Sequence, residues 1–222
     1  MEKGSKRSYE APKLERVEGA AARIVGHLLN ESEDLKKKNV ELERLSTIDA
    51  LTGIANRRGF DEAVRRMIAA IPPKGIDKNK EREYALHRLA IMVVDIDHFK
   101  KFNDEYGHAV GDEVLRAVAK NLVEHVREVD LVARWGGEEF IMAFPGADTE
   151  RILAKFGERK GEKETPARME VSVAVDGKTY NIQVSGGVAE YQPGEDFQST
   201  FNRADKALYL AKRTGRNRIV GY

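Results

Sequence analysis

The order of the predicted secondary-structure elements indicates an α+β protein of the ferredoxin-like type, in which helices flank a central antiparallel sheet. Residues 89–99, LAIMVVDIDHF, form an apolar run that contains two aspartates near its end, which is typical of a strand buried on both faces. A helix, a hairpin, a second helix, two strands, an amphipathic helix and a short strand are expected after it. Strand, helix, two strands, helix, strand is the ferredoxin-like order, here with additional elements.

These elements are expected between residue 47 and the end of the chain. A charged stretch with Pro and Gly at 72–83 predicts a loop, and a tight loop is expected to open the helix that begins near residue 112. The remaining patterns predict helices over about 60–70, 112–126, 149–156 and 197–215, and strands over about 131–135, 140–144, 168–175, 180–191 and 217–222.

The segment before this domain is predicted to be a polar, flexible tail over residues 1–19 and a coiled-coil helix over 20–46. Leu28, Leu35 and Leu42 recur every seven residues, and Asn39 falls in the same seam, which favours a parallel dimer. We therefore expect a homodimer through this helix. An amphipathic helix packed on its own domain is the alternative interpretation.

The composition excludes several classes of protein. The 222 residues are 41% hydrophobic and 34% charged, and 38 Lys and Arg nearly balance 37 Asp and Glu, which argues against a protein built to coat nucleic acid. There is no cysteine, so disulfides and thiolate metal sites are excluded. We find no membrane segment and no signal peptide in the sequence, and we expect a cytoplasmic location.

Two adjacent carboxylates mark the tip of the predicted hairpin. In ARWGGEEF, Gly136 and Gly137 are a hairpin signal because glycine reaches positive φ at little cost, and Glu138 and Glu139 follow them. Two carboxylates about 4 Å apart repel by ~4 kcal/mol at an effective dielectric constant near 20, so a cation or a proton is needed if a third acid lies close. A solvated acidic turn is the alternative.

Asp95, near the end of the apolar strand, is our candidate for that third acid. An Asp at a strand end and a Glu at a hairpin tip, without His or Cys, form an oxygen-only site suited to Mg²⁺, whose natural substrate is a phosphate ester. An aspartate that simply ends the strand is the alternative.

Polar and basic residues that could hold a phosphate or a base lie in two further segments. A tight loop can bind phosphates through its backbone N–H groups, although its Asn and Asp could be plain turn and N-cap residues, and basic residues after a helix could simply complement its dipole. The candidates are Lys100, Asn103, Asp112, Lys212 and Arg216.

Five segments together resemble the GGDEF family, the diguanylate cyclases, over about residues 47–222. They are DALTGIANRRGF, VVDIDHFKKFNDEYGHAVGDEVL, ARWGGEEF, VSGGVA and ADKALYLAKRTGRN, in the order and approximate spacing of the family. The resemblance implies a palm-type fold and the condensation of two GTP molecules into cyclic di-GMP with release of two pyrophosphates. Each of two facing domains would hold one GTP, and each 3′-hydroxyl would attack the other's α-phosphate.

The resemblance also implies the role of each site residue. Two Mg²⁺ ions per site, with Mn²⁺ able to substitute, would bind Asp95, Glu138 and the carbonyl of Ile96, and Glu139 would lie at the second metal or near the attacking hydroxyl. Asn103 and Asp112 would read the guanine edge. The phosphates would meet Phe99, Lys100, Lys212 and Arg216, and Gly136 and Gly137 would allow the backbone to approach them.

Product feedback is a further expectation. REVD, residues 127–130, ends five residues before Gly136, the spacing at which many family members carry an RxxD inhibitory site for cyclic di-GMP. Arg127 would fork onto guanine or phosphate, and Asp130 would accept a hydrogen bond from guanine; a solvated turn is the alternative. For the whole domain, a catalytically silent module that binds GTP or cyclic di-GMP, and a cyclase making a mixed adenine-guanine product, remain as other hypotheses.

Overall fold

The computed structural model describes residues 23, 25–38, 42, 46–77, 84–157, 169–175 and 177–222. The chain divides into two compact units, Met1–Ser46 and Thr47–Tyr222. The predicted tail over 1–19 lies outside the described residues, as do parts of the predicted 72–83 loop.

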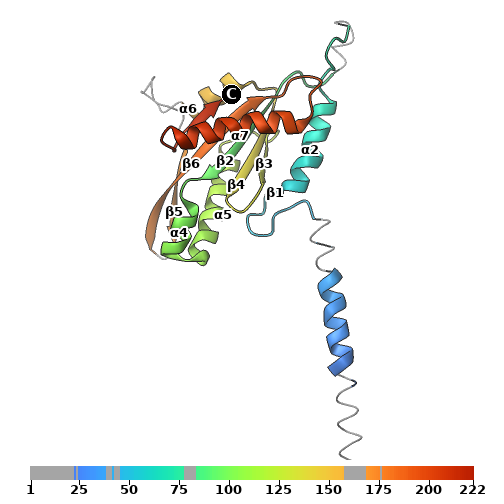
Figure 1. Cartoon of the computed structure of the whole chain (residues 1–222), viewed down its shortest axis with the longest axis vertical. Helices are drawn as coiled ribbons and strands as arrows, with labels where there is room; N and C mark the ends of the chain where they lie inside the picture. The colour runs from blue at the N-terminus through green and yellow to red at the C-terminus, as the bar shows by residue number, and fades with distance from the viewer. Residues whose placement is uncertain are drawn as a thin grey trace, which may run out of the picture. The chain divides into compact units, whose positions relative to one another are not determined.

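Seven strands in the described part of the second unit form one sheet in the order β1-β3-β4-β2-β6-β5, with β7 pairing with β6 (Figure 1). The pairs that involve β2, and the pairs β3–β4 and β5–β6, are antiparallel, whereas β1 runs parallel to β3 and β7 parallel to β6. The predicted α+β class and antiparallel centre are confirmed, with two short parallel additions. The strands are β1 (Ala55–Asn56), β2 (Leu89–Ile96), β3 (Leu131–Arg134), β4 (Glu139–Pro145), β5 (Met169–Val175), β6 (Lys178–Glu190) and β7 (Ile219–Gly221).

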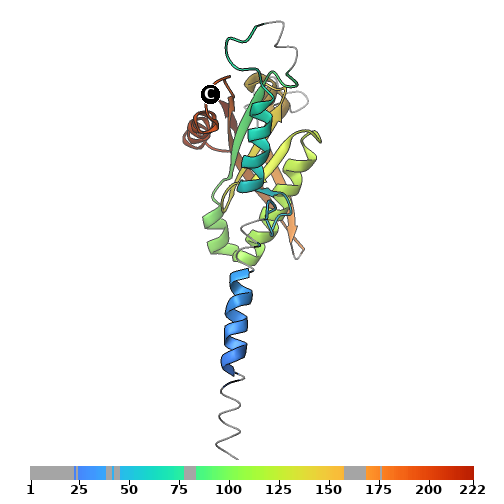
Figure 2. The ribbon, with the colours of Figure 1, turned by 90° about the vertical axis from the view of Figure 1, so that its right-hand side faces the viewer.

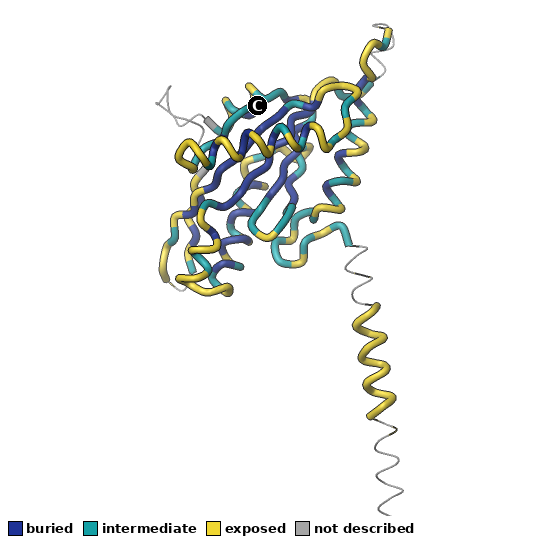
Figure 3. The backbone as a smooth tube through the Cα atoms, in the orientation of Figure 1, coloured by how far each residue is buried: buried dark blue, intermediate teal, exposed yellow. Residues whose placement is uncertain are grey.

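Strand β2 is buried along its whole length because helices cover both faces of the sheet. Its alternate side chains enter two separate cores, one shared with α5 and α6 and the other with α2 and α7. Figure 2 shows α7 and α5 on opposite sides of the sheet, and Figure 3 shows buried strands beneath the exposed outer face of α7. The helices are α2 (Arg57–Ala69), α4 (Phe99–Tyr106), α5 (His108–Glu124), α6 (Thr149–Gly157) and α7 (Phe197–Arg213).

The prediction of a tight loop before residue 112 is wrong, because this stretch forms α4 and the first turn of α5. Gly107, at φ 85°, ends α4 and separates the two helices. Phe102 and Tyr106 on α4 pack against Tyr180 of β6, with ring centroids 5.3 and 5.0 Å apart. A tertiary contact with a distant strand therefore stabilises a helix of only eight residues.

In the first unit, residues 25–38 are helical. The side chains of Leu28, Leu35 and Leu42 are 57%, 56% and 65% exposed. Asn39 lies outside the described residues, and the coiled coil stays a prediction. Across the described residues, no helix combines the length and apolar character that crossing a bilayer requires.

An ion pair secures the start of α7, the helix that carries Lys212. The Glu195 carboxylate accepts hydrogen bonds from Arg203 at 2.6 Å, from the Thr200 hydroxyl at 2.6 Å and from the Gln192 N–H at 2.9 Å. Arg203 also donates to the Glu190 carbonyl at the end of β6. Burial alone would raise the pKa of Glu195, but these donors outweigh it and lower the pKa to about 2.

We predict that Glu195→Gln lowers the free energy of unfolding by about 2 kcal/mol at pH 7, because it removes the charge from a partly buried, hydrogen-bonded pair. The folded-state pKa lies below the unfolded value, so this contribution is complete above about pH 4.5 and declines as the pH falls toward 2. Denaturant unfolding of both proteins at pH 7 and pH 3 measures it. A stability difference that does not narrow at pH 3 would contradict the prediction.

Candidate active site

The site forms where β2 ends beside the hairpin that joins β3 and β4. The N–H groups of Trp135 and Gly136 donate to the Glu139 carbonyl at 2.8 and 3.2 Å, which closes the predicted hairpin. The β2–β4 register sets Asp95 opposite Glu139, and the Ile96 N–H donates to the Glu138 carbonyl at 3.3 Å. Backbone pairing therefore brings the strand acid to the hairpin acids.

The two glycines are not needed for positive φ angles, which was one reason expected for them. Neither Gly136 nor Gly137 has a positive φ, so the turn does not require their conformational freedom. A Cβ at Gly136 would instead lie 2.8 Å from Glu139 Oε2. The absent side chain at Gly136 leaves room for the Glu139 carboxylate to fold back over the turn.

Asp95 and Glu138 form a half-enclosed pair of acids with a raised proton affinity. Asp95 is only 6% exposed, and burial is the main cause that raises its pKa, with Lys212 opposing the rise. Burial also raises the pKa of Glu138, and the charges of Asp95 and Glu139 raise it further. Glu138 is half-buried rather than fully solvated, which argues against a simple acidic turn.

Two basic residues, Lys212 in the last turn of α7 and Arg216 just after the helix, reach the acidic corner, the group formed by Asp95, Glu138 and Glu139. Lys212 Nζ lies 2.8 Å from Asp95 Oδ1, so Lys212 does more than complement the helix dipole. Arg216 has a left-handed backbone with φ 59°, and its Nε lies 3.9 Å from Asp97 Oδ1.

Asp97 is engaged with other partners. Its carboxylate accepts from the Ser185 hydroxyl at 2.8 Å and from the Asn217 N–H at 2.9 Å. Asp95 and Asp97 have different surroundings because β2 ends at Ile96, so Asp97 lies beyond the last residue of the strand.

The donor set suits a hard cation. Asp95 and Glu138 offer carboxylate oxygens, Ile96 offers a carbonyl, and no His or Cys ligand accompanies them in the set. Among the described residues, no group of three or more His, Cys, Asp or Glu side chains is arranged to hold a metal ion. A metal held by Asp95 and Glu138 would therefore need further ligands from backbone, water or phosphate oxygens.

A second group of polar residues lies where α4 meets α5. Asn103 sits within α4 and Asp112 within α5, so the turn and N-cap interpretations of these residues are wrong. Asn103 Oδ1 is buried and has no hydrogen-bond partner in the described structure. A Cβ at Gly111 would lie 1.9 Å from that oxygen. Gly111, which the sequence analysis missed, thus makes room for the Asn103 amide beside Asp112.

The residues of α4 that are expected to contact the phosphates differ in their exposure to solvent. Phe99 is 5% exposed and belongs to the core, so its side chain is not open to a ligand. Lys100 is exposed. No side chain caps the start of α4, where the first N–H groups point out of the helix.

Arg127 and Asp130 lie apart from the acidic corner, in a separate pocket of about 230 Å³. Arg127 Nη2 donates to Asp130 Oδ1 at 2.6 Å and to the Pro145 carbonyl at 3.1 Å. The Asp130 side chain is 1% exposed and therefore anchors Arg127 rather than facing a ligand. Arg151 and Lys155 also line this pocket and were not singled out in the sequence.

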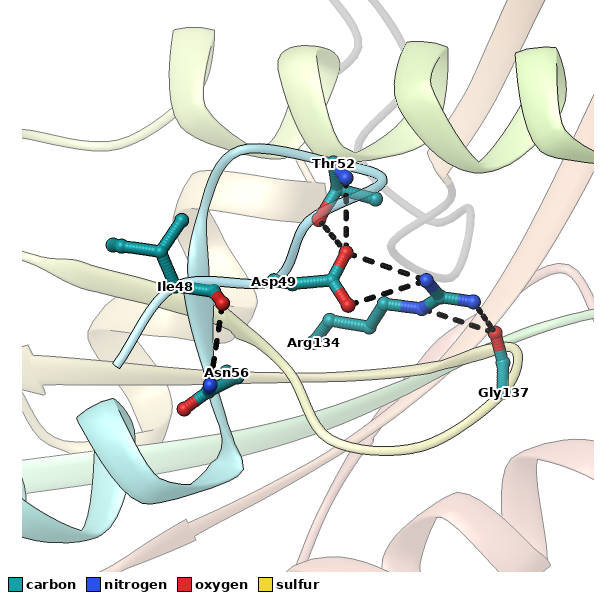
Figure 4. A network of polar contacts seen from close by, with 6 residues as sticks. All are labelled: Ile48, Asp49, Thr52, Asn56, Arg134 and Gly137. Atoms are coloured by element: carbon teal, nitrogen blue, oxygen red, sulfur yellow. Dashed lines mark hydrogen bonds and ion pairs between the residues drawn. The ribbon is translucent and has the colours of Figure 1, made fainter. Parts of the chain in front are cut away.

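A clamp of polar contacts holds the hairpin tip from behind (Figure 4). Arg134 donates to the Gly137 carbonyl at 2.8 Å and to both oxygens of Asp49 at 3.3 Å. Asp49 also accepts from the Thr52 N–H and hydroxyl at 2.9 and 2.6 Å. The sequence analysis assigned no role to Asp49 or Arg134, although both lie in quoted motifs.

Comparison with known proteins decides the family. The family model described as "Diguanylate cyclase, GGDEF domain" matches residues 46–218. The chain belongs to the GGDEF family. This GGDEF chain is 32% identical over 213 residues, or 95% of its length, to diguanylate cyclase DgcP of Pseudomonas aeruginosa, and 36% identical over 183 residues, or 82%, to diguanylate cyclase A of Treponema denticola.

The chain spans less than half the length of these two relatives, covering 29% and 46% of them. A crystal structure of the coiled coil and GGDEF domain of DgcB from Caulobacter crescentus in complex with c-di-GMP is also similar to it. That match has a TM-score of 0.61 and 32% identity, and it covers 91% of this chain and 99% of the other.

We predict that Gly111→Ala raises the dissociation constant of a GTP analogue about tenfold, because the new methyl group would displace the Asn103 amide from the expected guanine site. Alanine is otherwise the better helix former, so helix propensity gives no reason for weaker binding. Calorimetry on Gly111→Ala, Asn103→Ala and the double variant tests this.

The two effects should not add, since both act through one amide group. Full additivity, or unchanged affinity in Gly111→Ala, would contradict the proposed role of Gly111.

Proposed function

We propose that this GGDEF domain is a diguanylate cyclase that condenses two GTP molecules into cyclic di-GMP and releases two pyrophosphates. The observation that carries the proposal is the convergence of Asp95, Glu138 and Lys212 at the tip of the GGEEF hairpin. Paired carboxylates with a nearby ammonium suit the binding of a metal and a polyphosphate together. The named diguanylate cyclases among the relatives support this choice of reaction.

In this proposal Asp95, Glu138 and the Ile96 carbonyl hold a divalent metal, Mg²⁺ by the chemistry of the donors, with two ions per site. A divalent metal bound there would neutralise phosphate charge and lower the pKa of the attacking 3′-hydroxyl. Glu139, folded over Gly136, would either assist at the second metal or accept a hydrogen bond from that hydroxyl.

The rest of the site would hold the nucleotide. The uncapped N–H groups at the start of α4, including that of Phe99, and the side chains of Lys100, Lys212 and Arg216 would bind the triphosphate. The unpartnered Asn103 Oδ1 would accept a hydrogen bond from a guanine N–H group. Asp112 would accept from guanine N1–H and the 2-amino group, neither of which adenine offers.

Cyclisation needs two such domains, because each one holds one substrate. We propose that the heptad leucines at 28, 35 and 42 pair two chains and so raise the effective concentration of one domain near the other to roughly millimolar. Their exposure in the single chain is compatible with this pairing.

Product identification by mass spectrometry tests the activity. The wild-type protein with Mg²⁺ should give cyclic di-GMP from GTP and no dinucleotide from ATP. Glu138→Gln should lower the rate at least 100-fold while the unfolding midpoint stays unchanged, because a half-buried turn carboxylate contributes to charge rather than to packing.

Asp205→Asn, which neutralises an exposed carboxylate on α7, is the control and should keep wild-type activity. Nucleotide binding by the wild-type protein without any product would instead favour a silent binding module. A product from mixed ATP and GTP would favour a cyclase of relaxed specificity.

We further propose that the pocket around Arg127 binds cyclic di-GMP as a feedback inhibitor. Arg127 is 44% exposed at its side chain and is held by the buried Asp130, while Arg151 and Lys155 add positive charge to the same pocket. Guanidinium groups can donate two parallel hydrogen bonds to a phosphate or to the acceptor edge of guanine. Asp130 would act by orienting Arg127.

We predict that Arg151→Ala and Lys155→Ala each weaken inhibition by added cyclic di-GMP about tenfold and leave initial rates near normal, because they remove charge at a pocket away from the acids. Arg127→Ala is a less suitable variant, because it would remove the guanidinium group that donates to the buried Asp130 carboxylate. Arg65→Ala, at an exposed position on α2, is the control. Inhibition constants equal to that of the wild type in both pocket variants would argue against this site.

A further inference from the structure

Lys212 and Asp95 form the most direct charge pair in the acidic corner, and their geometry suggests a role for Lys212 beyond phosphate binding. The ammonium nitrogen lies 2.8 Å from Asp95 Oδ1, and the Lys212 side chain is 33% exposed while that of Asp95 is 9% exposed. The pair thus sits at the mouth of the site, with the lysine on the solvent side and the carboxylate inside.

An ammonium group and a divalent metal ion would compete for this carboxylate. A metal bound to Asp95 at about 2.1 Å would come within a few ångströms of the ammonium group, where the two cations repel strongly in a partly desolvated site. Lysine is suited to changing partners, because its charge sits at the end of a flexible four-carbon stem.

The surrounding charges explain why Asp95 needs such a partner. Glu138 and Asp97 both lie close enough to influence the same corner, and their charges are negative. Arg216, the other nearby cation, has its Nε 3.9 Å from Asp97 rather than from Asp95. Lys212 is therefore the cation that pairs directly with Asp95.

We propose that Lys212 is the counter-ion of Asp95 until a divalent metal displaces it, and that the displaced ammonium group then binds the phosphates of the nucleotide. This inference rests on the proposed function. Its consequence is that metal alone binds weakly, because it must compete with Lys212, whereas metal and nucleotide favour each other's binding. The coupling is reciprocal, so the nucleotide also binds better when the metal is present.

Binding of Mn²⁺ alone tests the proposal without any turnover. Free Mn²⁺ is measured by electron paramagnetic resonance at pH 8, because an alkaline pH favours the ionised form of Asp95 and of Glu138, whose pKa is raised. Lys212→Gln should bind Mn²⁺ about tenfold more tightly than the wild type, within the range usual for coupled sites. Lys206→Gln, which removes the same charge from an exposed position on α7, should not change the affinity, and Lys212→Arg should keep it weak.

The same titrations with a non-hydrolysable GTP analogue complete the test. The analogue should strengthen Mn²⁺ binding by the wild type, and by a smaller factor in Lys212→Gln. An affinity for Mn²⁺ alone that is unchanged or lower in Lys212→Gln overturns the counter-ion role.

Asp95→Asn separates this outcome from failure of the proposed function. If Asp95→Asn binds Mn²⁺ as well as the wild type does, the metal is not held at this corner and the proposed function fails together with the inference. If Asp95→Asn weakens binding while Lys212→Gln leaves it unchanged, the counter-ion role alone is wrong. Unfolding midpoints of all variants establish that each one is folded.

Discussion

The pairing register of β2 with β4 is the constraint on which the rest of the site depends. It places Asp95 opposite Glu139 and brings the Glu138 backbone to Ile96. Because side chains alternate along a strand, a slip of one residue would turn every apolar side chain of β2 toward the wrong core and Asp95 away from α7. Burial on both faces prevents such a slip, so the packing of the two cores also fixes the position of the acid.

The second requirement is a hairpin tip that stays in place despite its charge. Asp49 and Arg134 meet this requirement from outside the acidic corner, since Arg134 holds the Gly137 carbonyl and Asp49 holds Arg134. Burial tends to raise the pKa of Asp49, but hydrogen bonds from Thr52 and the charge of Arg134 outweigh it and lower the pKa. The Asp49 carboxylate therefore stays ionised at neutral pH. A strong ion pair behind the turn thus supports a turn whose own carboxylates repel one another.

The sequence predicted the elements that local patterns specify, and it was less informative where distant residues decide the outcome. The apolar run of β2, the GGEE hairpin and the amphipathic α7 have strong local signals, and the structure contains all three. Helix α4 depends on Tyr180, a residue about 80 positions away, and so was expected as a loop.

Side-chain geometry was beyond the reach of sequence patterns. The role of Gly136 follows from the position of Glu139, and that of Gly111 from the position of Asn103. Neither of these close side-chain contacts can be predicted from the spacing of residues in the sequence. Likewise, the four-residue RxxD pattern of Arg127 and Asp130 suggested two ligand-binding groups, whereas burial makes Asp130 the anchor of Arg127. The candidate residues could be predicted from the sequence, but the separate role of each one depends on the three-dimensional structure.

We propose that Asp95 and Glu138 together hold the metal that serves GTP. The most direct measurement is a crystal structure of the protein with Mn²⁺ and a non-hydrolysable GTP analogue, with the metal located by its anomalous scattering. We expect a peak about 2.2 Å from carboxylate oxygens of both Asp95 and Glu138, with Lys212 moved onto the phosphates. A nucleotide bound with its metal away from these two carboxylates would contradict it.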